Sequence, residues 1–136
     1  MRKHPARLQK AGISPGRYEE LKSICRQYRE YEAALRRARA GIVDRPERKS
    51  GAWHRPDPTG SAAQALADHP YARRVKLIEQ SAAAVAEPVI ARAILRSVSE
   101  GVSFEVLAPP IGNRQFYILR QLFFIELDRK LWEDRP

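Results

Sequence analysis

Apolar residues recur every three or four positions along most of this chain, which is the spacing of one face of an α-helix. No stretch shows the strict alternation of apolar and polar residues that is typical of a β-strand. Ten prolines interrupt the helical pattern and divide it into segments. The pattern therefore predicts an all-α fold of four to five helices, with a three-helix unit near the C-terminal end.

The most regular stretch is residues 88–132, which predicts a helix, a very short helix and a long final helix. The first helix begins at Pro88, whose missing N–H does no harm in a first turn, and ends before Gly101, a common C-terminal stop. Ser103 is suited to cap the short helix over residues 104–108, because its hydroxyl can accept a free backbone N–H. This order of elements is typical of a helix-turn-helix DNA-binding unit.

The connection to the last helix has the residues expected of such a motif. Ala108 would let the two helices cross closely, and Gly112 would supply a positive φ in the turn. Asn113 would cap the last helix, which is predicted to run to about Trp132. Short patterns of this kind also occur in plain three-helix packing units, so that alternative stays open.

The last helix combines a basic front with an apolar body. Its early polar residues stand where a recognition helix presents base-reading side chains: Asn113, Arg114, Gln115 and Arg120. Apolar residues form two arcs, one with Phe116, Leu119, Phe123 and Leu127, and one with Ile118, Leu122 and Ile125. Such a helix is either central in its domain or buried against a second copy, which would make a homodimer. In the alternative interpretation, these early polar residues are ordinary solvated side chains on a helix that belongs to the core.

Charge divides the chain into unequal parts. Residues 1–60 carry 15 Lys and Arg against 7 Asp and Glu, whereas residues 61–136 carry 10 against 9. A basic half beside a nearly neutral helical half suggests a polyanionic partner. We expect a basic segment and helix over residues 1–40, a Pro/Gly-rich loop or linker over 41–60, and a helical domain over 61–136.

Residues 14–40 predict the first long helix, with one apolar stripe that includes Cys25. Cys25 is therefore interpreted as a core thiol, and a single cysteine excludes an internal disulfide and fits a reducing cytoplasm. The densest basic cluster starts at the end of this helix and continues into the loop: Arg36, Arg37, Arg39, Arg45, Arg48 and Lys49. Trp53 in the loop is expected to pack onto the helical body. A second helical region, residues 61–86, should be kinked or split at His69–Pro70.

Local motifs for catalysis are missing. The three histidines, His4, His54 and His69, are scattered, and no Ser/His/Asp or Cys/His arrangement, phosphate-binding glycine loop or metal-ligand spacing is recognisable. We therefore expect a protein that is no enzyme and needs no metal or other cofactor. No apolar run is long enough to span a membrane, and the basic N-terminus is not followed by the apolar core of a secretory signal.

Three stretches carry a resemblance to the ArpU/RinA-type late transcriptional regulators of phages and prophages: RYEELKSICRQYREYEAAL, DPTGSAAQAL and EGVSFEVLAPPIGNRQFYILRQLFFIELDRKL. In that family the C-terminal piece is similar to the promoter-binding region of sigma factors. The positions that match its pattern are Gly101, Ser103, Phe116, Tyr117, Arg120, Phe123 and Phe124. The resemblance implies double-stranded DNA as a partner and adds RNA polymerase as a second one.

These observations together predict a cytoplasmic, all-α DNA-binding protein of phage or prophage type. The helix starting at Asn113 would enter a major groove, and the short helix at Ser103 would brace the DNA backbone. The basic cluster would add salt-sensitive affinity. The competing hypotheses are a helical adaptor for protein–protein contacts in phage assembly and a DNA-packaging component similar to a small terminase subunit.

Overall fold

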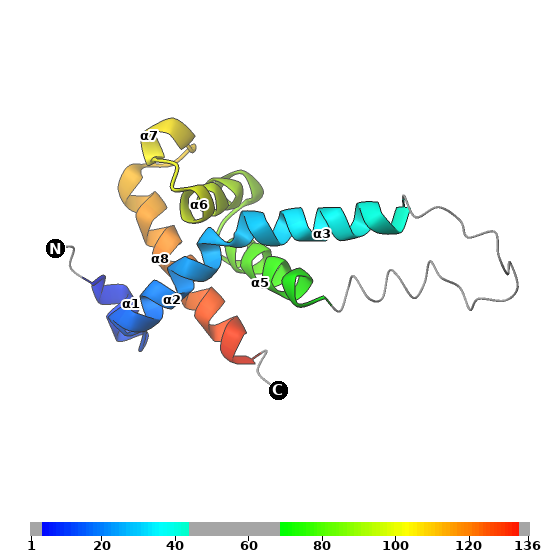
Figure 1. Ribbon diagram of the computed structural model, residues 1–136. Coiled ribbons are helices and arrows are strands. Elements are labelled where there is room, and N and C mark those ends of the chain that lie inside the picture. The colour runs from blue at the N-terminus through cyan, green and yellow to red at the C-terminus, as the bar shows by residue number, and fades with distance from the viewer. Residues whose placement is uncertain (1–3, 44–68, 134–136) are drawn as a thin grey trace, which may run out of the picture.

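The computed structural model describes residues 4–43 and 69–133, and these ranges form an all-α fold (Figure 1). In chain order the helices are α1 (Ala6–Lys10), α2 (Pro15–Arg26), α3 (Tyr28–Val43), α5 (Pro70–Val85), α6 (Pro88–Glu100), α7 (Phe104–Leu107) and α8 (Asn113–Glu133). The predicted contributions of Arg45, Arg48, Lys49 and Trp53 lie outside the described residues. The same holds for the part of the second helical region that precedes His69.

Local capping chemistry sets the ends of α6 and α7, as the sequence predicts. Pro88 is the first residue of α6, and Gly101 ends the helix in the left-handed conformation, with a φ of 70°. The Ser103 hydroxyl accepts a hydrogen bond from the Val106 N–H at 3.4 Å and so caps α7. These ends are local because each needs only a proline, a glycine or a short hydroxyl side chain.

The turn before α8 differs from its prediction at three positions. Ala108 lies after α7 in the left-handed conformation, with a φ of 43°, and is exposed, so it is no close-packing residue between helices. The predicted positive φ at Gly112 is absent; among the described glycines, Gly12 and Gly101 have it. The Gly112 carbonyl accepts the Phe116 N–H at 2.9 Å, so Gly112 takes the cap position and Asn113 is already helical. The chain therefore makes its sharp turn at Ala108, four residues earlier than expected.

The predicted single helix over residues 14–40 is two helices. Between α2 and α3, the Gln27 N–H is shared by the carbonyls of Ser23 and Ile24, both at 3.2 Å. This sharing tightens the last turn of α2, and α3 continues at an angle to it (Figure 1). The helix also ends later than predicted, because α3 includes Gly41 and runs to Val43.

The helix α5 lies at the centre of the fold and packs against α3, α6 and α8. The buried residues form one cluster, to which α1, α2, α3, α5, α6 and α8 all contribute. Its largest fully buried side chains come from α8: Phe116, Phe123 and Phe124. The helix α2 covers one side of α8, where the Tyr18 ring meets the Phe124 ring edge-on with 5.2 Å between the ring centres. The nearly all-round apolar character of α8 thus reflects its central position.

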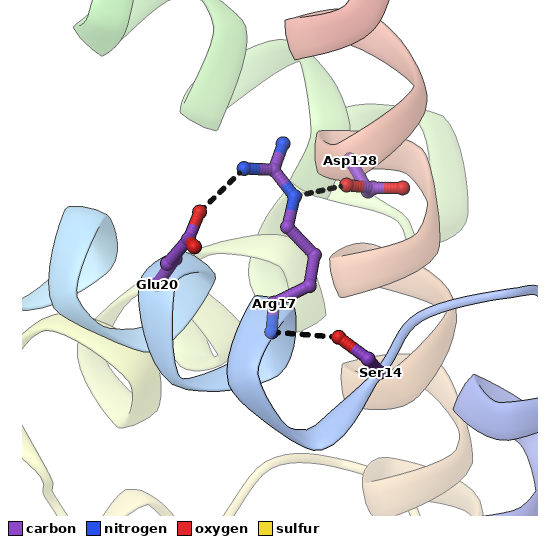
Figure 2. A network of polar contacts seen from close by, with 4 residues as sticks. All are labelled: Ser14, Arg17, Glu20 and Asp128. Atoms are coloured by element: carbon purple, nitrogen blue, oxygen red, sulfur yellow. Dashed lines mark hydrogen bonds and ion pairs between the residues drawn. The ribbon is translucent and has the colours of Figure 1, made fainter.

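A polar network joins the start of α2 to the far end of α8 (Figure 2). The Arg17 guanidinium contacts Asp128 at 2.6 Å and Glu20 at 2.9 Å, while the Arg17 backbone N–H donates to the Ser14 hydroxyl at 3.1 Å. Burial lowers the pKa of Arg17, but its hydrogen bonds to Asp128 and Glu20 outweigh that effect, and the pKa is raised. One side chain therefore holds two helices that are far apart in sequence.

Candidate nucleic-acid interface

The first three residues of α8 are exposed: Asn113, Arg114 and Gln115, called the α8 front below. The next residue, Phe116, is fully buried, and its ring lies 5.5 Å from that of Phe104 in α7. This contact fixes the start of α8 against α7. The α8 front therefore extends beyond the core on a well-anchored helix.

Two other predicted contact residues share this exposed end of the molecule. Ser103 is exposed, although its hydroxyl is engaged in capping α7. Tyr117 is 41% exposed, and it lies three and four residues after Arg114 and Asn113, which places the three on one side of the helix. The exposed strip thus contains a guanidinium, an amide and a phenol, all of which can donate hydrogen bonds to nucleic acid.

Arg120 is placed differently. It is half-buried, its guanidinium lies 5.6 Å from the centre of the Phe124 ring, and its Nε atom is buried without a partner in the described part of the chain. It lines a hollow of about 500 Å³ between α8 and the start of α2, together with His4, Tyr18, Lys22, Tyr117 and Gln121 among others. Burial raises the pKa of the Cys25 thiol, and the charge of Arg120 offsets a part of that rise. Arg120 therefore lies toward α2 rather than with the α8 front.

The acidic second half of α8 is neutralised by ion pairs. Arg129 contacts Glu126 and Glu133, both at 2.7 Å, and Asp128 is held by Arg17. These carboxylates would otherwise repel a phosphate backbone. Their pairing leaves the positive charge of Arg114 unopposed along its own helix.

A second positive surface lies at the other side of the molecule and is called the basic arm. It consists of Arg36, Arg37 and Arg39 on α3, and Arg73, Arg74 and Lys76 on α5. The first turns of the two helices are in contact, since the Tyr31 and Tyr71 rings are 4.8 Å apart, and the three α3 arginines lie further along α3 from this contact. Five of the six cations are exposed and Arg74 is half-buried; none of them is ion-paired within the described residues.

The fold does not bring the two groups of predicted contact residues together. In Figure 1 the end of α3 points away to one side of the body, whereas α7 and the start of α8 lie on the opposite side. Sequence reasoning found Arg36, Arg37 and Arg39 but missed the α5 cations. A signal was present, because residues 70–78 hold three cations and no acid.

No protein-family model matches this chain, and neither a curated protein nor a solved structure does. The described residues form an all-α fold, and the α8 front and the basic arm are the two candidate contact surfaces on it. Within residues 4–43 and 69–133, no helix is both long and apolar enough to cross a membrane. In the same ranges, no group of three or more His, Cys, Asp or Glu side chains is placed to hold a metal ion.

Proposed function

We propose that this protein binds double-stranded DNA sequence-specifically through the α8 front, as a non-enzymatic transcriptional regulator of phage or prophage type. The observation that carries the proposal is the exposure of Asn113, Arg114 and Gln115 at the start of a 21-residue helix that is anchored in the core by four later residues, Phe116, Phe123, Phe124 and Leu127. A helix end of this kind can enter a major groove while the rest of the helix stays in the core.

The side chains of the α8 front have the chemistry needed to read base edges. An arginine can donate two hydrogen bonds to guanine, and asparagine or glutamine can pair with the acceptor and donor of adenine. Each such contact discriminates against a wrong base by about 1–3 kcal/mol. Arg114 and Gln115 are therefore the proposed specificity residues, with Tyr117 at the edge of the contact.

The elements next to α8 would support this contact. The turn after α6 and the short α7 hold the α8 front in place through the Phe104–Phe116 contact. Ser103 would act by shaping this turn, because its hydroxyl already accepts the Val106 N–H. Arg120 is half-buried and lies toward α2, so it is not expected to touch a base.

The test is fluorescence anisotropy with a duplex selected by the protein from a random DNA library. Arg114→Ala with Gln115→Ala should weaken binding to the selected duplex at least about tenfold, which corresponds to about 1.4 kcal/mol. The matched control is Arg92→Ala with Gln80→Ala, which removes the same two side-chain types from exposed positions on α6 and α5. The control should leave the affinity within about twofold, a change below roughly 0.5 kcal/mol.

Two results would overturn the proposal. If no duplex is bound even at low salt, DNA is not the partner, and the adaptor hypothesis takes its place. If duplexes are bound but the α8 and control variants behave alike, the contact is electrostatic and does not use the α8 front. In that case the salt dependence of binding should also be independent of the DNA sequence.

A further inference from the structure

We propose that one molecule holds two DNA duplexes at once, one on the α8 front and a second, without sequence preference, on the basic arm. This inference rests on the proposed function, because the first duplex is the one bound by α8. It adds a second binding site and a second activity, the bridging of DNA segments.

The basic arm has the properties of a phosphate-binding surface. Its six cations lie on the last turns of α3 and the first turns of α5, and no acidic residue occurs in residues 33–43 or 70–78. Elsewhere on the described surface, cations such as Arg17, Arg29, Arg96 and Arg129 are paired with carboxylates. A concentration of unpaired cations binds DNA by releasing the counterions of its phosphates.

The chemistry of the arm also indicates that it would not read a sequence. Arg36 and Arg39 share one side of α3, while Arg37 lies on another, so the charges surround the helix instead of forming a single edge. Among the exposed polar residues of this stretch there is no asparagine or glutamine to recognise adenine. Arginine can also contact guanine, but cations that surround a helix cannot all face one groove. Contacts to phosphates should therefore dominate, and duplex of any sequence is the expected ligand.

Because of where the basic arm lies, the duplex that it binds cannot be the same duplex that the α8 front binds. The body of the protein lies between the arm and the α8 front, as Figure 1 shows. A domain of this length has a radius of gyration of only about 14 Å. DNA resists bending over distances of up to about 150 base pairs, so one duplex could reach both surfaces only by folding tightly around the protein. Two separate duplexes, or two distant parts of one long molecule, meet both surfaces without bending.

In the experiment, a duplex fixed to beads captures a second duplex only if the protein holds both. The selected duplex is attached to beads, and a fluorescent 20-base-pair duplex of unrelated sequence is added together with the full-length protein. The arm variant is Arg36→Gln, Arg37→Gln and Arg39→Gln, because glutamine keeps the helix propensity while it removes the charge. The charge-matched control is Lys10→Gln, Arg26→Gln and Arg92→Gln, three exposed cations outside the arm.

The wild type and the control should retain the fluorescent duplex on the beads, and the arm variant should retain at least about fivefold less. The arm variant should still bind the selected duplex within about threefold of wild type by anisotropy. Sedimentation should show two duplexes for each protein chain. Retention should also fall steeply with salt, since the second contact is made only to phosphates.

The possible failures are distinguishable. If the arm variant retains the second duplex as well as wild type does, bridging through the arm is wrong, and α8 binding is unaffected. If sedimentation shows a protein dimer with one duplex on each α8 front, bridging by a single chain is wrong. If the variant Arg114→Ala with Gln115→Ala still binds the selected duplex normally, the proposed function fails first, and the inference fails with it.

Discussion

The guanidinium Nε of Arg17, in the first turn of α2, donates a hydrogen bond of 2.6 Å to Oδ1 of Asp128, near the end of α8 (Figure 2). The two residues are 111 positions apart in the sequence. Both side chains are mostly buried, with 23% and 17% of their surfaces exposed. The pair therefore connects the N-terminal helices to the last helix in a setting where water screens the charges only in part.

Loss of this pair should be costly. Asp128→Ala leaves the Arg17 guanidinium partly buried without its main partner, and we expect the free energy of unfolding to fall by about 2 kcal/mol. Glu20→Ala is the control: Glu20 contacts the same guanidinium, but its side chain is 66% exposed, so its removal should cost less than about 0.5 kcal/mol. Urea unfolding followed by circular dichroism measures both. If both variants lost the same unfolding free energy, the contact with Asp128 would contribute no more than the exposed contact with Glu20.

The buried thiol of Cys25 should make the protein sensitive to alkali. Burial raises the pKa of Cys25 from its ordinary 9.0 to about 12, although the charges of Arg120 and Arg26 lower it. Between pH 9 and 12 the unfolded chain loses a proton that the folded chain keeps, so stability that is complete below pH 9 is lost as the pH rises. From pH 9 to 11, the unfolding free energy of wild type should fall faster than that of Cys25→Ala, by up to about 1.4 kcal/mol per pH unit. Parallel pH profiles of the two proteins would contradict this.

Arg120→Met should not harm the fold. The Arg120 Nε is buried without a partner in the described part of the chain, and an unpaired buried donor costs roughly 1–3 kcal/mol. Methionine keeps much of the length of the side chain and can pack on Phe124 without a polar atom. We expect the melting temperature to stay the same or rise by a few degrees, and Arg114→Met, at an exposed site, to leave it unchanged. A clear fall for Arg120→Met would mean that the guanidinium makes a stabilising contact.

Ala108 carries a backbone cost that glycine would remove. Its φ of 43° is in the left-handed region, where a Cβ atom costs about 1–2 kcal/mol. Ala108→Gly should therefore raise the unfolding free energy by about 0.5 kcal/mol after the extra chain entropy of glycine is subtracted. The reciprocal change, Gly101→Ala at a φ of 70°, should lower it by about 1 kcal/mol, although open space surrounds the added methyl. Chemical unfolding of both variants measures the two changes in unfolding free energy. A loss of stability in Ala108→Gly would contradict the argument.

The features predicted correctly are those set by residues that lie close together in the sequence. Pro88 and Gly101 bound α6, and Ser103 caps α7, because each acts through its own backbone or a short side chain. The buried residues of α6 recur every three or four positions, as the helical spacing of apolar residues predicts: Ile90, Ala93, Ile94 and Val98. Cys25 is in the core, as its place in the α2 stripe predicts.

The features missed depend on packing between distant segments. The break at Gln27 follows no proline or glycine, and Ala108 adopts a conformation that alanine does not prefer on its own. Periodicity could not show that α2 covers the Arg120 and Phe124 side of α8. Nor could it show that α5 returns beside α3 and adds Arg73, Arg74 and Lys76 to the basic arm.

The central place of α5 has a consequence for synthesis of the chain. Ribosomes deliver α1, α2 and α3 before α5, and among the described residues α3 packs mainly against α5. A nascent chain stalled before Pro70 would therefore expose Tyr28 and Tyr31, which the finished protein buries. These rings become buried only when α5 packs against α3, so this part of the core has to wait for residues 70–85.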